Sequence, residues 1–189
     1  MRIVAGKYKG RKLPFMKEGT LRPTTDYARE ALMNILNNAL DLEECRVLDL
    51  FAGTGAMSFE LLSRGVKSSI CVESNKIHYN YIRSAATFLN EKNITILMTD
   101  VFLFIKKNEM PYSIVFADPP YDLKNLSELP QLILDSKSMN ADSTLIVEHP
   151  ESIDFSKVAG FYSHKNYGKV NFSFFRKEDN NPSTTLPNE

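Results

Sequence analysis

The sequence lacks several features that identify whole classes of protein. Its only cysteines among 189 residues are Cys45 and Cys71, and both lie in or beside apolar, strand-like segments. We expect both thiols to be reduced and buried, as in a cytoplasmic protein, rather than joined in a disulfide. No apolar run is long enough to cross a membrane, and the basic first residues do not lead into the apolar region of a secretory signal.

The chain also has no net charge, since 23 basic residues balance 23 acidic ones. Overall charge therefore indicates no polyanionic partner, but residues 1–22 are rich in basic residues and contain one acid, Glu18. Tyr8 lies among them, and cations that follow phosphates beside a ring that stacks on a base favour contact with nucleic acid. A solvated surface extension is the alternative. The residues expected to make the contact are Arg2, Lys7, Lys9, Arg11, Lys12 and Arg22.

Residues 47–57 predict a buried strand that enters a tight turn and then a helix. Apolar residues flank one acid, Asp49, then Gly53 and Gly55 break the run, and helical spacing resumes at Ala56. Glycines allow a sharp turn and the close approach of a ligand, and open α/β sheets bind ligands at the carboxyl ends of their strands. A turn without a ligand is the alternative.

Glu73 ends the next apolar run, residues 70–73. An acid at the tip of a second strand can accept hydrogen bonds from both ribose hydroxyls of an adenosine. Nicotinamide cofactors and S-adenosylmethionine both contain adenosine, so these two segments leave the choice of cofactor open.

Beyond residue 45 the chain alternates between strand-like and helical patterns. Strands are expected at 47–51, 69–73, 94–98, 113–117 and 144–148. Helices are expected at 56–64, 75–91, 101–108 and 125–136. This alternation implies right-handed βαβ units and a parallel sheet. Two final strand-like runs, 160–167 and 169–176, meet near Gly168, and we expect them to form a hairpin at the edge of the sheet.

Three regions are expected along the chain. Residues 1–40 form a basic arm or hairpin, broken by Gly6 and Gly10, followed by a helix with an apolar stripe. Residues 41–177 form the α/β domain. Residues 178–189 are polar, contain two prolines and are expected to be disordered.

The motif Asp118-Pro119-Pro120-Tyr121 follows directly after the fourth expected strand, at the same edge of the sheet as the glycine turn. A rigid turn is the structural alternative. The exocyclic amine of a nucleobase is a poor nucleophile, because its lone pair is delocalised into the ring. The Asp118 carboxylate and the Pro119 carbonyl can accept its two N–H groups, so that the lone pair faces a methyl donor.

Tyr121 completes this arrangement, because its ring can stack on the base. Catalysis of this kind depends on positioning and electrostatics and needs no strong base before attack. A hydride-transfer enzyme has no need of the motif. The motif therefore favours S-adenosylmethionine over a nicotinamide cofactor.

Together these segments resemble the S-adenosylmethionine-dependent, Rossmann-like methyltransferases with an [N/D/S]PP[Y/F/W] motif. More narrowly, they resemble the RsmD family of ribosomal RNA guanine-N2 methyltransferases. The resemblance covers nearly all of the chain and is carried by MRIVAGKYKGRKLP, LRPTTDYARE, DLFAGTGAMSFELLSRG, VESN, FADPPY and IVEH. DPPY alone is shared with adenine-N6 and cytosine-N4 methyltransferases, whereas RIVAGKYKGRKL and LRPT are more specific to the family. The family's usual Leu-Gly after the glycine turn is Met57-Ser58 here.

The resemblance implies a Rossmann-like methyltransferase fold, with a mostly parallel seven-stranded sheet that ends in an antiparallel hairpin. It also implies S-adenosylmethionine as the cofactor, with the glycines around its methionine part, Glu73 on its ribose and Asp100 on its adenine amino group. Asp49 has a simpler alternative role, which is to cap the amides of the glycine turn, and Asp100 has one as a helix cap. The expected cofactor-binding residues are Asp49, Phe51, Gly53, Gly55, Glu73, Asp100 and Val101.

The implied substrate is a guanine in 16S-type small-subunit ribosomal RNA, within an assembled or assembling particle, and its base must be accessible or flipped out. The basic N-terminal residues then contact RNA, and the enzyme is expected to be a monomer. A DNA adenine or cytosine amino-methyltransferase is one alternative, and a non-catalytic RNA assembly factor that binds S-adenosylmethionine is another. His78, His149 and His164 show no metal-ligand spacing, so no metal site is expected. No residue pattern assigns a role to Glu148-His149.

Overall fold

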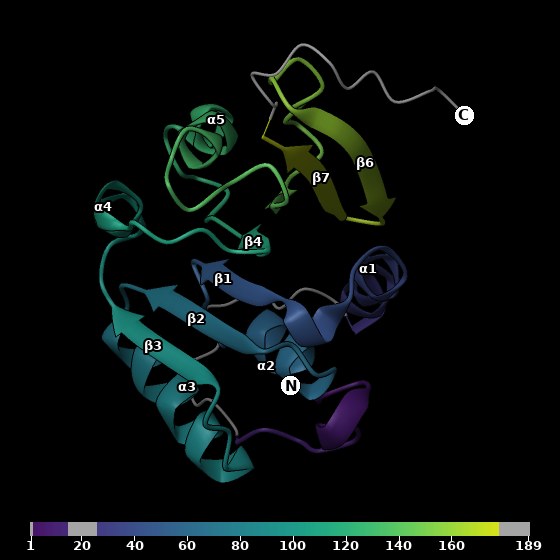
Figure 1. The fold of residues 1–189 in the computed structure, drawn as a ribbon, viewed down its shortest axis with the longest axis vertical. Coiled ribbons are helices and arrows are strands. Elements are labelled where there is room, and N and C mark those ends of the chain that lie inside the picture. The colour runs from purple at the N-terminus through teal and green to yellow at the C-terminus, as the bar shows by residue number, and fades with distance from the viewer. Residues whose placement is uncertain (1, 15–25, 178–189) are drawn as a thin grey trace.

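The computed structural model describes residues 2–14 and 26–177. Arg22, the LRPT stretch and the tail at 178–189 lie outside these residues. A seven-stranded sheet forms the centre of the described part, in the order β3-β2-β1-β4-β5-β7-β6 (Figure 1). Its strands are β1 Arg46–Leu50, β2 Ser68–Glu73, β3 Ile94–Met98, β4 Ile114–Ala117, β5 Thr144–His149, β6 Phe161–Tyr167 and β7 Val170–Arg176.

The pairing confirms the predicted α/β fold. Strands β1 to β5 pair in parallel, whereas β7 pairs antiparallel with both β5 and β6, so the hairpin extends one edge of the sheet. The chain order reverses at β1, which lies between β2 and β4. Such a reversal opens a crevice at the carboxyl ends of the two strands, and open α/β sheets bind ligands there.

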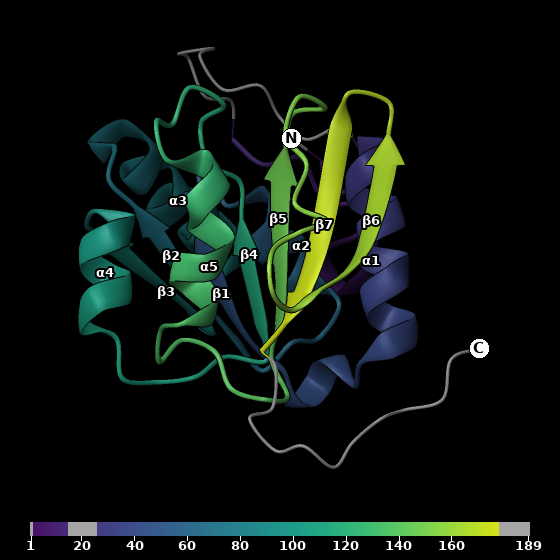
Figure 2. The ribbon, with the colours of Figure 1, turned by 90° about the horizontal axis from the view of Figure 1, so that it is seen from above.

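Helices cover both faces of the sheet. In Figure 2, α4 and α5 lie in front of the strands, and α1, α2 and α3 lie behind them. The elements are α1 Asp26–Ala39, α2 Ala56–Ser63, α3 Lys76–Leu89, α4 Val101–Lys107 and α5 Leu129–Leu134, with 3-10 turns at Gly6–Tyr8, Leu42–Glu44 and Leu126–Glu128. Among the described helices, none has both the length and the apolar content that a membrane crossing requires.

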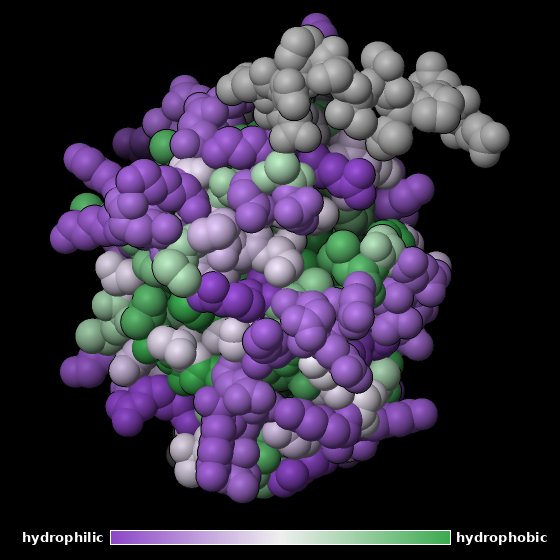
Figure 3. Space-filling view, in the orientation of Figure 1, coloured by the Kyte–Doolittle hydropathy of each residue, from purple (hydrophilic) through white to green (hydrophobic). Residues whose placement is uncertain are grey.

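Residues of one strand alternate between two hydrophobic cores. Val47 packs on the side of α1 and α2, whereas Leu48 and Leu50 pack on the side of α4 and α5. Strands β4 and β5 are buried on both faces, which explains their unbroken apolar sequence. The surface seen in Figure 3 is mainly hydrophilic, with apolar residues visible mostly across its middle.

The four helices predicted beyond residue 45 are all shorter in the structure, two of them by more than one residue. The helix predicted at 75–91 ends at Leu89, because Asn90 adopts a left-handed conformation with φ 54° that closes the helix. The helix predicted at 125–136 is divided into a 3-10 turn and α5, and Pro130 lies in the first turn of α5, where its missing N–H costs no helical hydrogen bond.

The N-terminal residues form a hairpin that is fixed to the domain rather than a free arm. Its ends meet in a bridge between Arg2 and Lys12, and the Ile3 N–H donates to the Arg11 carbonyl at 3.1 Å. Ile3 is buried, and the N–H groups of Val4 and Ala5 donate to the Glu60 carboxylate of α2 at 2.9 and 3.0 Å. These contacts confirm the predicted hairpin.

Candidate active site

A cavity of about 680 Å³ lies at the carboxyl ends of β1, β2, β4 and β5 and is bounded on one side by the turn between β6 and β7. Its position is the crevice at which the strand order reverses. The lining residues are Phe51, Gly53, Glu73, Ser74, Asn75, His78, Asp100, Val101, Asp118, Pro119, Pro120, Tyr121, Glu148, Tyr167, Gly168, Lys169 and Val170. The glycine turn and the Asp-Pro-Pro-Tyr motif therefore share one cleft.

The glycine turn brings Gly53, but not Gly55, to the cavity. Gly53 has φ 56°, and its N–H donates to Glu73 Oε2 at 2.8 Å. Gly55 also has a positive φ, but a Cβ there would lie 3.1 Å from the Phe59 ring and 3.3 Å from Ile82. Glycine is thus required at Gly55 by the turn and by the packing of α2 on α3, rather than by a ligand.

Asp49 also does not line the cavity. It lies on the α2 face of β1, where its Oδ2 accepts hydrogen bonds from the Ser58 N–H at 3.3 Å and the Ser58 hydroxyl at 2.6 Å. Burial raises the pKa of Asp49 to about 7, against the lowering effect of the Ser58 hydrogen bonds. The structure therefore supports the alternative role, in which Asp49 caps the start of α2, and it gives Ser58 a structural function.

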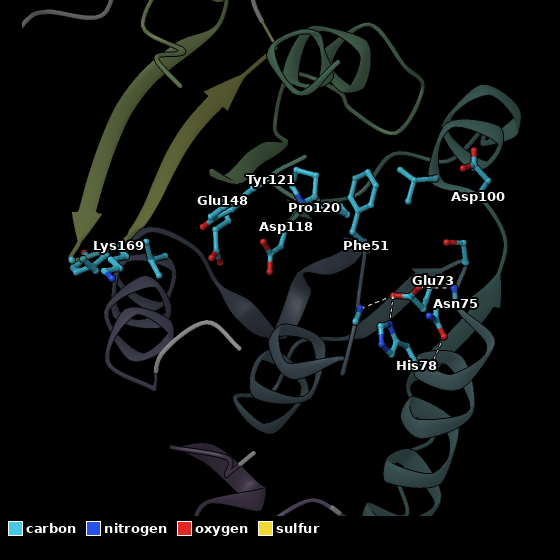
Figure 4. Close-up of a pocket in the computed structure, with 17 residues that line it drawn as sticks. Phe51, Glu73, Asn75, His78, Asp100, Asp118, Pro120, Tyr121, Glu148 and Lys169 are labelled. Carbon is cyan, nitrogen blue, oxygen red and sulfur yellow. Dashed lines mark hydrogen bonds and ion pairs between the residues drawn. The ribbon is translucent and has the colours of Figure 1, made fainter. Parts of the chain in front are cut away.

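Glu73 joins the glycine turn to the start of α3. Besides the bond from Gly53, its Oε1 accepts the Asn75 N–H at 2.7 Å, and His78 Nδ1 lies 3.7 Å from its Oε2 (Figure 4). Asn75 caps α3 by accepting the N–H groups of Ile77 and His78. Ser74, Asn75 and His78 were not predicted as site residues, although the cap residue Asn75 is a recognisable signal that the chain turns into a helix here.

Asp100 has one of the two roles that the sequence left open, that of a helix cap, and it also lies at the cavity. Its carboxylate accepts the Leu103 N–H at 3.0 Å and so caps α4, and the residue also lines the cavity beside Val101. Phe51 adopts φ 60°, an uncommon conformation for a residue with a Cβ, and its ring packs edge-to-face on Phe102 at 6.4 Å. Strained backbone of this kind clusters at ligand sites.

All four residues of the Asp-Pro-Pro-Tyr motif line the cavity. The Asp118 N–H donates to the Leu50 carbonyl at 3.4 Å, which joins the ends of β4 and β1. Burial raises the pKa of the Asp118 carboxyl well above its ordinary value, and the neighbouring charges of Glu148 and Asp49 raise it further. Tyr121 is 39% exposed, so its ring remains accessible.

The side of the cavity bounded by the hairpin was not predicted. Glu148 is the last but one residue of β5 and lies beside Asp118, Tyr167 is the last residue of β6, and Gly168 and Lys169 form the turn to β7. Figure 4 shows Lys169 at one end of the group, Glu73 and Asp100 at the other, and Asp118 between them. The Tyr167 ring packs edge-to-face on Tyr27 of α1 at 5.9 Å.

Of the predicted nucleic-acid-binding residues that the structure describes, none lines the cavity. Lys7 pairs with Glu91 at 2.8 Å, and Arg11 lies over the Phe88 ring at 4.7 Å and donates to the Phe88 carbonyl. Those partners lie at or beyond the C-terminal end of α3, whereas the cavity lies at its N-terminal end. Arg2, Lys9 and Lys12 are exposed on the hairpin surface.

Comparison with known proteins gives a match over nearly the whole chain. The family model described as conserved hypothetical protein 95 matches residues 1–176. Ribosomal RNA small subunit methyltransferase D from Escherichia coli K12 is 31% identical over 182 residues, which cover 94% of this chain and 90% of that protein.

Solved structures show the same fold. The Escherichia coli protein yhhF matches with a TM-score of 0.81 and 29% identity, and the match covers 94% of this chain and 98% of that one. RsmC from Thermus thermophilus, a 16S rRNA N2 methyltransferase solved with AdoMet and guanosine, matches with a TM-score of 0.66 at 18% identity, over 86% of this chain and 45% of that one. The Rossmann-like methyltransferase fold is confirmed.

Proposed function

Because the chain belongs to the RsmD family, the family described as conserved hypothetical protein 95, we propose that it is a ribosomal RNA methyltransferase. It transfers the methyl group of S-adenosylmethionine to the exocyclic N2 amine of a guanine in small-subunit ribosomal RNA. The observation that carries this proposal is the single cavity in which Gly53 and Glu73 lie with Asp118, Pro119 and Tyr121.

The residues at one end of the cavity fit the cofactor. Glu73 accepts two backbone N–H groups, and a carboxylate has about four acceptor sites, so it retains capacity for ribose hydroxyls. Among the described residues, four acids line the cavity, Glu73, Asp100, Asp118 and Glu148, against one lysine at the far end. This excess of acidic over basic side chains favours a sulfonium cation over the pyrophosphate of a nicotinamide cofactor.

The chain's own residues then position the amine. Asp118 and the Pro119 carbonyl accept its two N–H groups, the proline ring fixes the direction of the peptide, and Tyr121 stacks on the base, which is worth roughly 1–3 kcal/mol. Bound S-adenosylmethionine supplies the methyl group. The sulfur–carbon bond would break as the N2–carbon bond forms, S-adenosylhomocysteine would leave, and the methylated amine, now acidic, would pass one proton to water.

The other end of the cavity is proposed to admit the RNA. Tyr167 and Lys169 form its rim, so a ring and a cation are available to a nucleotide that enters there. Lys9 and Lys12, on the N-terminal hairpin, are proposed to contact phosphates farther along the RNA. The proposed substrate is an assembled or assembling small-subunit particle, and the enzyme is proposed to act as a monomer.

Labelled-methyl transfer to purified small subunits, naked ribosomal RNA and DNA, followed by nucleoside mass spectrometry, tests the proposal. We expect N2-methylguanosine in small-subunit RNA, with no transfer by an Asp118→Ala variant. Methylated adenine or cytosine in DNA would instead identify a DNA amino-methyltransferase. Binding of S-adenosylmethionine without transfer to any of the three would identify an assembly factor.

A further inference from the structure

Glu148 lies directly beside the carboxylate that is proposed to hold the reactive amine. Ala117 of β4 pairs with Val147 of β5, so the next residues along the two neighbouring strands, Asp118 and Glu148, lie at the same level. Neighbouring strands lie roughly 4.8 Å apart. Figure 4 shows the two carboxylates side by side and pointing in the same direction.

Burial makes a negative charge costly at both Asp118 and Glu148. Glu148 is 4% exposed and lines the cavity, and its charge contributes to the raised pKa of Asp118. Buried carboxylates are retained where donors or cations can satisfy them. Because carboxylates accept hydrogen bonds, a ligand that brings several N–H donors to this pair suits it better than a ligand that brings acceptors.

The three bases with exocyclic amines differ in the atom next to the amine-bearing carbon. Guanine presents N1–H, a donor, beside its N2 amine. In adenine and cytosine the corresponding ring nitrogens, N1 and N3, are acceptors. Since an ionised carboxylate only accepts hydrogen bonds, it pairs with the guanine edge and repels the other two.

We infer that Glu148 accepts the N1–H of the target guanine and so selects guanine over adenine and cytosine. The inference rests on the proposed function, in which Asp118 and the Pro119 carbonyl hold the N2 amine. The guanine edge then offers three N–H groups to three neighbouring acceptors. This places the choice of base at the end of β5, whereas the Asp-Pro-Pro-Tyr motif itself accommodates any nucleobase amine.

The test uses RNA in which 2-aminopurine replaces the target guanine, once mass spectrometry has located that guanine. 2-Aminopurine keeps the N2 amine but has an acceptor at N1. The wild-type enzyme should methylate guanine at least about tenfold faster than 2-aminopurine, because hydrogen bonds to charged groups are worth about 1.5–3 kcal/mol. Equal rates on the two bases would overturn the inference.

Variants of Glu148 then ask whether this residue is the source of the preference. Glu148→Gln places an amide there, which can donate to an acceptor, so the guanine preference should fall about tenfold or more while calorimetric affinity for S-adenosylmethionine is unchanged. Glu148→Asp keeps an acceptor-only group and should retain the preference at a lower rate. Glu151→Gln, at an exposed position outside the cavity, is the matched control.

The outcomes separate this inference from the proposed function. A wild-type enzyme that methylates no guanine N2 contradicts the proposed function itself. An enzyme that methylates guanine N2, but whose preference over 2-aminopurine is the same in the wild type and in Glu148→Gln, contradicts only the role of Glu148. Loss of the preference in both Glu148→Gln and Glu148→Asp, with folding intact by circular dichroism, also overturns the acceptor role.

Discussion

Asp49→Asn isolates the effect of one buried carboxyl on stability. Asp49 is 2% exposed, and its Oδ2 accepts two hydrogen bonds from Ser58. Asparagine has nearly the same size, and its side-chain oxygen can still accept from Ser58. The substitution therefore removes the charge while it leaves the packing and the cap of α2 in place.

The sign and size of the effect follow from the pKa of Asp49, which burial raises from 3.8 to about 7 in the folded state. The folded state then binds the proton more tightly than the unfolded state, so the wild type loses stability as the pH rises between these values. At about 1.4 kcal/mol per pH unit, the loss between about pH 5 and pH 8 is about 2–3 kcal/mol. Asp49→Asn lacks this contribution.

Urea unfolding of both proteins at several pH values measures the difference. The free energy of unfolding of Asp49→Asn, relative to wild type, should rise by about 2–3 kcal/mol between about pH 5 and pH 8 and stay constant above that. Other titrating groups cancel in the comparison, because both proteins contain them. A relative stability that is independent of pH, or that falls with rising pH, would refute a raised pKa at Asp49.

Further substitutions test the proposed active site and the proposed RNA contacts. Asp118→Ala should abolish methyl transfer, whereas Asp118→Asn should keep a measurable rate because its amide oxygen can accept an N–H; equal loss in both would contradict the acceptor role. Wild-type affinity for S-adenosylmethionine, measured by calorimetry, should increase as the pH rises through the raised pKa of Asp118 and then level off, and Asp118→Asn should weaken this dependence. Glu73→Ala should weaken S-adenosylmethionine binding at least about tenfold, and an unchanged dissociation constant would remove Glu73 from the site. Joint replacement of Lys9 and Lys12 by glutamine should weaken RNA binding and reduce the slope of its salt dependence by the equivalent of about two phosphate contacts. Lys157→Gln, the control, should change neither the affinity nor the slope. A fall in cofactor affinity with an unchanged salt slope would exclude the RNA role.

The sheet and half of the site were predictable because their signals are local. Buried parallel strands have unbroken apolar runs, and a glycine turn or an Asp-Pro-Pro-Tyr motif directly after such a run must lie at a carboxyl end. The orientation of Asp49 was also within reach of the sequence. It lies two residues after Val47 and therefore faces the α2 side of the sheet, away from the cavity.

The remainder of the site depends on contacts that are distant in the sequence. Lys169 reaches the cavity only because β7 inserts between β5 and β6, and hydrophobic periodicity does not reveal that order. Lys7 has the pattern of a free cation in the sequence, but it pairs with Glu91, which follows α3. Glu148 is the last but one residue of a buried strand, and only the neighbouring end of β4 makes it part of a carboxylate pair.

In the proposed function, the acidic side chains that line the cavity serve both the cofactor and the target base. Burial raises the pKa of Asp118, and the neighbouring charge of Glu148 raises it further. In the proposed reaction, a sulfonium cation bound near Glu73 would favour the ionised form of Asp118, which is the form proposed to accept the amine. Since such coupling is reciprocal, the ionised acceptor would also favour the cation. Cofactor binding would thus prepare Asp118 and Glu148 for a base edge made of donors, and of the bases with an exocyclic amine only guanine presents such an edge.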